Sequence, residues 1–150
     1  MKVPCGLLVL LLTGICIAQP DPVAELQHRA DGAKGVDCSR LSIQVARQSL
    51  EMANRQFGTG EVKAAHTEVD RSLRYATRAV DCTLQARKGD KAAEIDLRRL
   101  IRRMKDILQT LDSEDHPHVA QSLTELEEQR DRLLRSIFGS AAEHSGEKKP

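Results

Sequence analysis

One short segment of the chain carries side chains that could bind a divalent ion. Residues 114–118 read Glu-Asp-His-Pro-His, which places two imidazoles and two carboxylates close together. These nitrogen and oxygen ligands suit divalent metals, but the spacing of His116 and His118 matches no standard zinc pattern. Helix capping by Asp115 and Pro117 explains the segment without a metal. A small-ligand-binding or divalent-metal-binding four-helix bundle using His116 and His118 is therefore the alternative interpretation.

Known catalytic motifs are missing from the sequence. It contains no G-x-S-x-G nucleophile motif, no H-E-x-x-H metalloprotease motif and no glycine-rich phosphate loop. Its many carboxylates belong to ordinary charged helical faces, so no general acid–base pair can be singled out. The lone His66 is typical of packing or of a surface position. We therefore expect a protein that is not an enzyme and that uses no cofactor.

The first residues have the features of a secretory signal peptide. Lys2 supplies a positive charge, and an apolar stretch follows at residues 7–12 and 15–17. This stretch is shorter than the roughly 20 residues that a membrane-spanning helix needs, and Cys16-Ile17-Ala18 is a small-x-small cleavage site. We interpret residues 1–18 as a cleaved signal, which predicts an exported bacterial protein, periplasmic or secreted. An uncleaved anchor is the alternative.

Two cysteines, Cys38 and Cys82, remain after removal of residues 1–18. Export implies an oxidising compartment, where a disulfide is the expected state of such a pair. Both cysteines lie equally far from residue 60, where glycines predict a turn between two helices. Antiparallel helices joined at this turn would place the cysteines opposite each other. We therefore expect a Cys38–Cys82 disulfide at the open end of the pair, with two unpaired buried thiols as the alternative.

The rest of the chain has the periodicity of amphipathic helices. Apolar residues recur every three or four positions between residues 37 and 138. Breaks near Gly58 and Gly60, at residues 88–90 and at residues 112–117 divide this stretch into four helices. The prediction is an all-α fold in which four amphipathic helices form two antiparallel αα-hairpins.

The same pattern predicts the domain boundaries. Residues 19–36 are rich in Pro and Gly and are expected to be a linker, with at most one short helix across residues 22–30. Residues 37–138 form the helical domain. Gly139 is expected to end the last helix, and residues 139–150 to form a disordered polar tail.

Part of the first predicted hairpin resembles a tetratricopeptide-type repeat. The small, aromatic, turn and packing positions of one such repeat are matched, within residues 53–76, by Ala53, Phe57, Gly60-Glu61-Val62, Ala65 and Leu73. The positions upstream differ from the family, and no second copy follows. The resemblance implies either a bundle or a tetratricopeptide-like stack, and protein binding on a concave helical face. It carries over no particular binding residue.

Composition narrows the class of partner. The formal net charge is +1 and aromatic residues make up 2% of the chain. Such a chain lacks both the bulk positive charge and the stacking side chains of nucleic-acid-binding proteins. With no stable membrane span expected after signal cleavage, we predict an exported helical protein-interaction or scaffold module whose partner is another protein.

Two arginine-rich ridges are the candidate partner-binding surfaces. Arginine and tyrosine are enriched among the residues that dominate interface energies. The first ridge is Arg71, Tyr75 and Arg78, and the second is Arg99 and Arg103. Residues 88–111 are net basic and residues 112–138 net acidic. The second ridge is therefore also expected to face acids of the last helix, namely Glu125, Glu127, Glu128 and Asp131.

Overall fold

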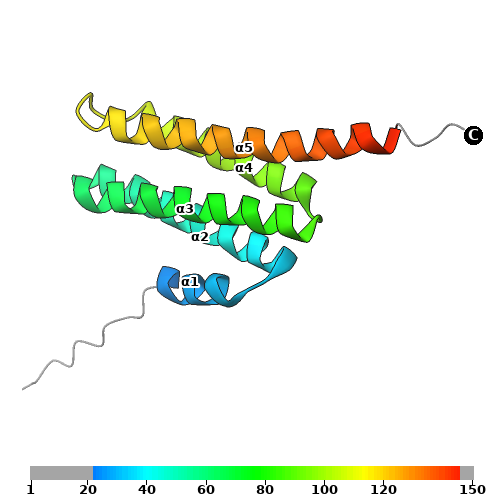
Figure 1. The fold of residues 1–150 in the computed structure, drawn as a ribbon. Coiled ribbons are helices and arrows are strands. Elements are labelled where there is room, and N and C mark those ends of the chain that lie inside the picture. The colour runs from blue at the N-terminus through cyan, green and yellow to red at the C-terminus, as the bar shows by residue number, and fades with distance from the viewer. Residues whose placement is uncertain (1–21, 146–150) are drawn as a thin grey trace, which may run out of the picture.

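The described chain, residues 22–145 of the computed structural model, is entirely helical (Figure 1). The all-α class is confirmed, but these residues form five helices where four were expected. The predicted signal peptide and its cleavage site lie outside the described residues. The helices are α1 (Pro22–Gly32), α2 (Gly35–Gly58), α3 (Val62–Ala86), α4 (Asp90–Leu108) and α5 (His116–Ser145).

The extra helix, α1, occupies the segment expected to be a linker. It begins at Pro22, a residue whose fixed φ and missing N–H suit the first turn of a helix. Val23, Leu26 and Ala30 recur at helical spacing and are all buried, and α1 packs along α2. The segment therefore belongs to the hydrophobic core, although only three of its side chains signal this in the sequence.

The central layer consists of α2 and α3, which run antiparallel and side by side (Figure 1). Gly60 has a φ of +79°, a left-handed conformation that favours glycine, in the turn between them. Small residues fill the contact, and without bulky side chains the two backbones can approach closely. The fully buried alanines of the two helices are Ala46, Ala53, Ala65, Ala76 and Ala79.

The last two helices lie on the opposite side of this layer from α1 (Figure 1). They pack against each other, α4 also against α2, and α5 also against α3. Glu94 of α4, only 7% exposed, joins them by accepting hydrogen bonds from Arg98 and Arg130. The hydrogen bond from Arg98, with the one from Arg130, holds the pKa of the Glu94 carboxyl below its ordinary value.

The prediction that α5 ends at Gly139 is wrong. The helix continues to Ser145 and projects past the neighbouring helices in Figure 1. One glycine inside a long helix costs only about 1 kcal/mol relative to alanine, which the rest of α5 can offset. No helix within residues 22–145 combines the length and apolar character needed to cross a bilayer.

The cysteine pair lies at the end of α2 and α3 that is remote from their turn. Cys38 and Cys82 are at disulfide-bonding distance, with Cα atoms 5.9 Å apart. Beside them the hydroxyls of Ser39 and Thr83 form a buried hydrogen bond of 2.7 Å. This end of the layer is thus held by a second contact between the same two helices.

Replacing Cys38 with Ser should lower the free energy of unfolding by about 2–4 kcal/mol, because a disulfide restricts the unfolded chain. Urea denaturation followed by circular dichroism measures the change. The double variant Cys38→Ser/Cys82→Ser is the control, since adding a reductant should destabilise the wild type and leave this variant unaffected. Peptide mapping that finds two free thiols in the oxidised wild type would contradict the prediction.

Candidate functional site

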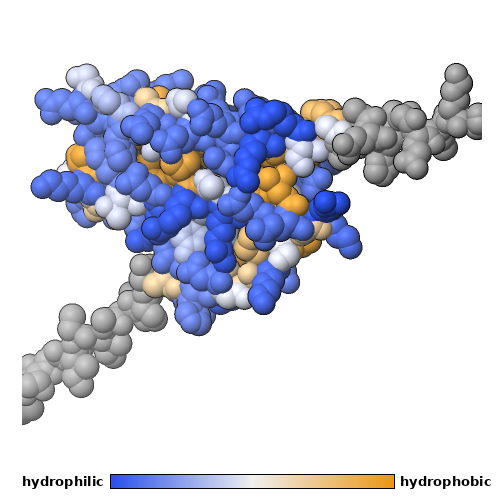
Figure 2. Space-filling view, in the orientation of Figure 1, coloured by the Kyte–Doolittle hydropathy of each residue, from blue (hydrophilic) through white to orange (hydrophobic). Residues whose placement is uncertain are grey.

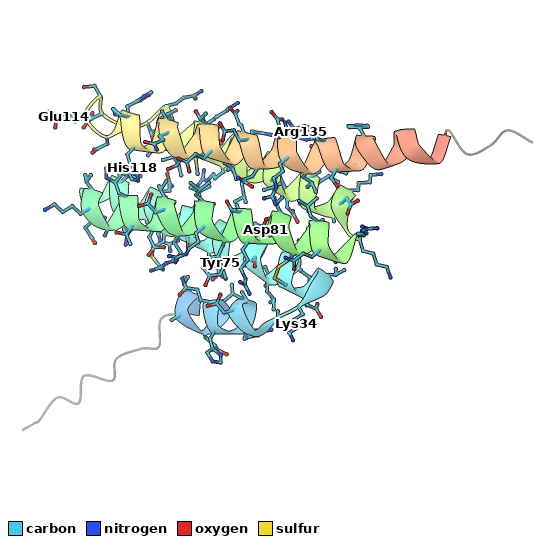
Figure 3. All side chains as sticks on the ribbon, viewed as in Figure 1. Lys34, Tyr75, Asp81, Glu114, His118 and Arg135 are labelled. Atoms are coloured by element: carbon cyan, nitrogen blue, oxygen red, sulfur yellow. A yellow bond between two sulfur atoms is a disulfide. The ribbon has the colours of Figure 1, made fainter. Side chains whose placement is uncertain are left out.

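The first predicted ridge does not form an exposed surface, because α1 covers it. Tyr75 is only 5% exposed, and its hydroxyl donates to both carboxylate oxygens of Asp31 at 3.0 and 3.1 Å (Figure 3). Arg78 donates to the main-chain oxygens of Ala30 and Asp31. Arg71 pairs with the buried Glu68 of its own helix, at 2.9 Å. Tyr75 is therefore buried where an exposed position was expected, whereas Arg71 and Arg78 are half-buried.

These contacts instead fasten the end of α1 to α3. The last carbonyls of a helix have no partner within it and carry partial negative charge, so a guanidinium is a suitable donor to them. Arg78 supplies that donor. Burial, followed by the hydrogen bond that the hydroxyl donates to Asp31, raises the pKa of the Tyr75 phenol above its ordinary value of 10.0. The neutral phenol is the form that stabilises the docked helix.

The two histidines of the predicted metal segment, His116 and His118, have different surroundings. His118 lies 2.8 Å from the Asp70 carboxylate and points from α5 toward α3 (Figure 3). Its ring stacks on that of His66 at 4.3 Å between centroids, and Phe57 meets His66 edge-on. His116 is exposed. Among residues 23–139, whose side chains the structure describes, no three His, Cys, Asp or Glu converge on a position that could hold a metal.

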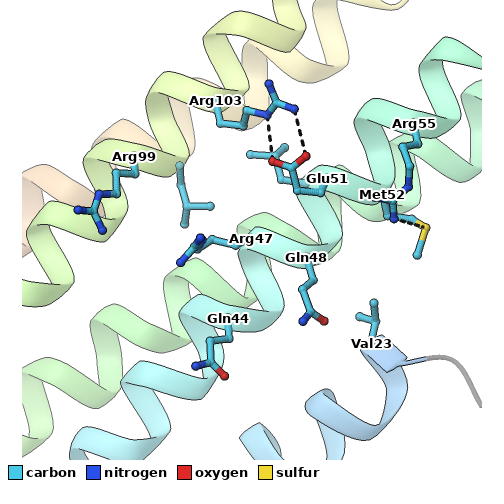
Figure 4. A pocket seen from close by; sticks show the side chains of 11 residues that line it. Val23, Gln44, Arg47, Gln48, Glu51, Met52, Arg55, Arg99 and Arg103 are labelled. Carbon is cyan, nitrogen blue, oxygen red and sulfur yellow. Dashed lines mark hydrogen bonds and ion pairs between the residues drawn. The ribbon is translucent and has the colours of Figure 1, made fainter.

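The second predicted ridge, Arg99 and Arg103, lies in a groove that runs over α2 between α1 and α4 (Figure 4). We call it the arginine groove, and its volume is about 550 Å³. The buried Leu50 and Leu100 form part of its floor. Its remaining lining includes Val23, Met52, Gln44, Gln48, Glu51, Arg47 and Arg55.

Two of the four arginines have carboxylate partners. Arg103 donates from Nε and Nη2 to the two carboxylate oxygens of Glu51, at 3.1 and 3.0 Å (Figure 4). Arg99 pairs with Asp96 at 3.2 Å. The expected pairing of these arginines with acids of the last helix is wrong for both, because Arg103 reaches α2 and Arg99 stays on α4. From that acidic set, Glu127 pairs with Lys105 at 2.7 Å.

The other two arginines, Arg47 and Arg55, are exposed and have no carboxylate partner among the described residues. Arg55 donates only to the sulfur of Met52, a weak acceptor, at 3.5 Å. Guanidinium groups bind carboxylates and phosphates through two parallel hydrogen bonds. The groove thus offers two available anion-binding groups above an apolar floor.

Sequence reasoning missed Arg47 and Arg55, although a signal was present. Residues 47, 51 and 55 are spaced by four and therefore lie along one face of a helix. That face becomes one side of a groove only because α1 packs beside it. Because the packing of α1 on α2 was not predicted, these residues looked like an ordinary solvated surface.

No protein-family model matches this chain, and neither a curated protein nor a solved structure matches it significantly. The resemblance of residues 53–76 to one tetratricopeptide-type hairpin therefore stays a prediction.

Changing Tyr75 to Phe should weaken the docking of α1, with a loss of about 1 kcal/mol in the free energy of unfolding. Because the folded-state pKa is raised, this stabilisation is present below the unfolded pKa and is lost as pH rises through the folded pKa. Tyr75 is the sole tyrosine, so an absorbance titration of the phenol reports its pKa directly. The midpoint should lie above 10.0 in the folded wild type and fall in urea.

The variant supplies the control for the stability measurement. When the pH is raised into the alkaline range, the thermal stability of the wild type should fall by more than the thermal stability of Tyr75→Phe. Equal alkaline sensitivity of the two proteins, or a folded phenol that titrates at its unfolded value, would contradict the assignment of Tyr75 as a contact that holds α1.

Proposed function

We propose that the protein is an exported helical interaction module without catalytic activity, which binds an acidic segment of a partner protein in the arginine groove. In this proposal α2–α3 and α4–α5 act as two stacked antiparallel hairpins, and α1 supplies one edge of the groove. Export is inferred from the leader sequence. The single observation that supports the proposal is that two guanidiniums beside the apolar floor, Arg47 and Arg55, have no carboxylate partner among the described residues.

The chemistry of the groove favours a carboxylate-bearing segment. Four of its lining residues are arginines and one is an acid, and that acid, Glu51, is already bound to Arg103. An entering carboxylate would meet Arg47 or Arg55 without displacing an existing ion pair. Leu50 and Leu100 beneath them suit an apolar side chain between two acids. Such a combination of polar rim and apolar floor is typical of peptide recognition.

The lining also argues for binding rather than for chemistry. It contains no Ser, Cys, His or Lys that could act as a nucleophile or shuttle a proton. It contains no aromatic side chain on which a nucleic-acid base could stack. Its four arginines supply positive charge, but the rest of the chain has no net positive charge.

A small anionic ligand is the second candidate function. The groove volume of about 550 Å³ falls within the range of roughly 300–1,000 Å³ that small-molecule sites occupy. This candidate is the small-ligand alternative from the sequence, with the binding site at the arginines instead of at His116 and His118. The two candidates make different predictions: free citrate or glutamate should bind as tightly as the peptide only if the ligand is a small anion.

A labelled twelve-residue peptide of Glu, Asp, Gly and Pro with one central Leu tests the proposal. We expect it to bind the wild type with an affinity that falls as salt rises. Arg47→Glu/Arg55→Glu should weaken binding by about tenfold to a hundredfold, which corresponds to about 1.4–2.8 kcal/mol. Fluorescence anisotropy gives the dissociation constants, and circular dichroism checks that each variant is folded.

The matched control reverses two arginines outside the groove. Arg102 and Arg135 are both exposed, and neither lines the arginine groove. Arg102→Glu/Arg135→Glu makes the same change in net charge and should leave binding within about twofold of the wild type. An equal loss in both variants would show bulk charge attraction instead of a site. Citrate that competes at its own concentration as well as the peptide does would favour the small-ligand candidate.

A further inference from the structure

Exposed hydrophobic side chains gather at one end of the molecule. Among the described residues, three large hydrophobic side chains are exposed: Val36 at 47%, Ile95 at 36% and Phe138 at 68%. They belong to α2, α4 and α5, yet Ile95 and Phe138 line the same groove. Gly89 also lines it, and a Cβ placed there would lie 3.9 Å from Val36. Two helices, α4 and α5, therefore contribute exposed apolar side chains to one groove, and Val36 of α2 lies close to its Gly89.

This surface is a groove between the start of α4 and the projecting part of α5. We call it the α4–α5 groove, and its volume is about 1,120 Å³. Leu134 and Ile137 lie on the α5 side and Ile95 on the α4 side. Figure 2 shows hydrophobic surface, in orange, among hydrophilic residues near the end where α5 projects. Glu94, held by Arg98 and Arg130, keeps the two walls at a set separation.

The rim of the α4–α5 groove is basic. Arg87, Lys88 and Lys91 are exposed and have no ion-pair partner within residues 22–145. Two acids also line the groove, but one of them, Glu94, is already bound to two arginines. The other is Asp90, so the rim has more cations without an ion-pair partner than acids. An occupant is therefore favoured by negative charge at its edges and by apolar side chains at its centre.

We propose that the α4–α5 groove binds one amphipathic helix of a partner protein, with the apolar face of that helix inward and acidic residues on its flanks. Helices commonly bind in this way, with apolar anchors at positions i, i+3, i+4 and i+7. Ile95, Ile137 and Phe138 would contact those anchors, and Lys88 and Lys91 the acidic flanks. This second site is distinct from the arginine groove, so the protein could hold two segments at once.

Other occupants fit the observations less well. In a symmetric pair of copies the same basic rim would face itself, and like charges disfavour that contact. Residues 146–150 read Gly-Glu-Lys-Lys-Pro and contain no apolar anchor. Residues 1–21 are apolar but hold a single acid, Asp21. A flat lipid surface would reach a protruding side chain more readily than a groove between two helices.

An eighteen-residue peptide with a leucine face and a glutamate face is the probe. We expect it to bind the full chain and to gain helical circular dichroism on binding. Ile95→Ser/Phe138→Ser should weaken binding by at least tenfold, and both positions are exposed enough for the fold to tolerate the change. Lys88→Glu/Lys91→Glu should also weaken binding and reduce its salt dependence. A peptide of the same composition in scrambled order should bind at least tenfold more weakly.

The arginine-groove variant separates this proposal from the previous one. Arg47→Glu/Arg55→Glu should bind the helical peptide with an affinity within twofold of the wild type. Likewise, Ile95→Ser/Phe138→Ser should bind the Gly- and Pro-containing peptide with an affinity within twofold of the wild type. Helical-peptide binding that is unchanged in Ile95→Ser/Phe138→Ser would overturn the inference. The inference would also be overturned if the helical peptide fails to bind and Phe138 is instead needed for binding to phosphatidylglycerol vesicles or for dimerisation in analytical ultracentrifugation.

Discussion

The close packing of α2 against α3 is the constraint on which the rest of the described structure depends. Each of the other helices packs against one or both of them, and α4 and α5 also pack against each other. Fully buried alanines such as Ala46, Ala53 and Ala76 leave room for the two backbones to approach. A larger side chain at any of these positions would push the pair apart, which costs typically 1–3 kcal/mol in a packed core. The glycine turn and the Cys38–Cys82 pair hold its two ends.

The arrangement around this pair creates both grooves. Because α1 and α4 pack on different sides of α2, a strip of α2 between them is uncovered and carries Arg47 and Arg55. Because α5 extends past the start of α4, it places Leu134, Ile137 and Phe138 beside that start. Neither groove is a property of one helix, and each would be lost if a single neighbouring helix moved.

The sequence was informative where the signal is local. A period of three to four apolar residues, with glycine between stretches, predicted the helical class and the approximate extents of α2, α3 and α4. The equal distance of Cys38 and Cys82 from residue 60 also predicted their proximity. Both inferences require only knowledge of which residues are neighbours along a helix or across one short turn.

The sequence was misleading where long-range contacts decide the outcome. A helix as short as α1 is marginal by itself and is held by its buried face and by Tyr75 and Arg78, far along the chain. Without α1, Tyr75 looks like an exposed interface residue. Periodicity likewise places Arg103 on a face but does not say which helix it meets, and Glu51 of α2 proved to be its partner.

Nuclear magnetic resonance of the arginine side chains tests the central claim, that α1, α2 and α4 together form a site for acidic segments. Titration with the Gly- and Pro-containing acidic peptide should shift the Nε–Hε signals of Arg47 and Arg55 and the amide signals of α1. The signal of Arg135, which lies outside the groove, should remain unchanged. Shifts confined to Arg135 and other exposed arginines, with Arg47, Arg55 and α1 unaffected, would contradict the account.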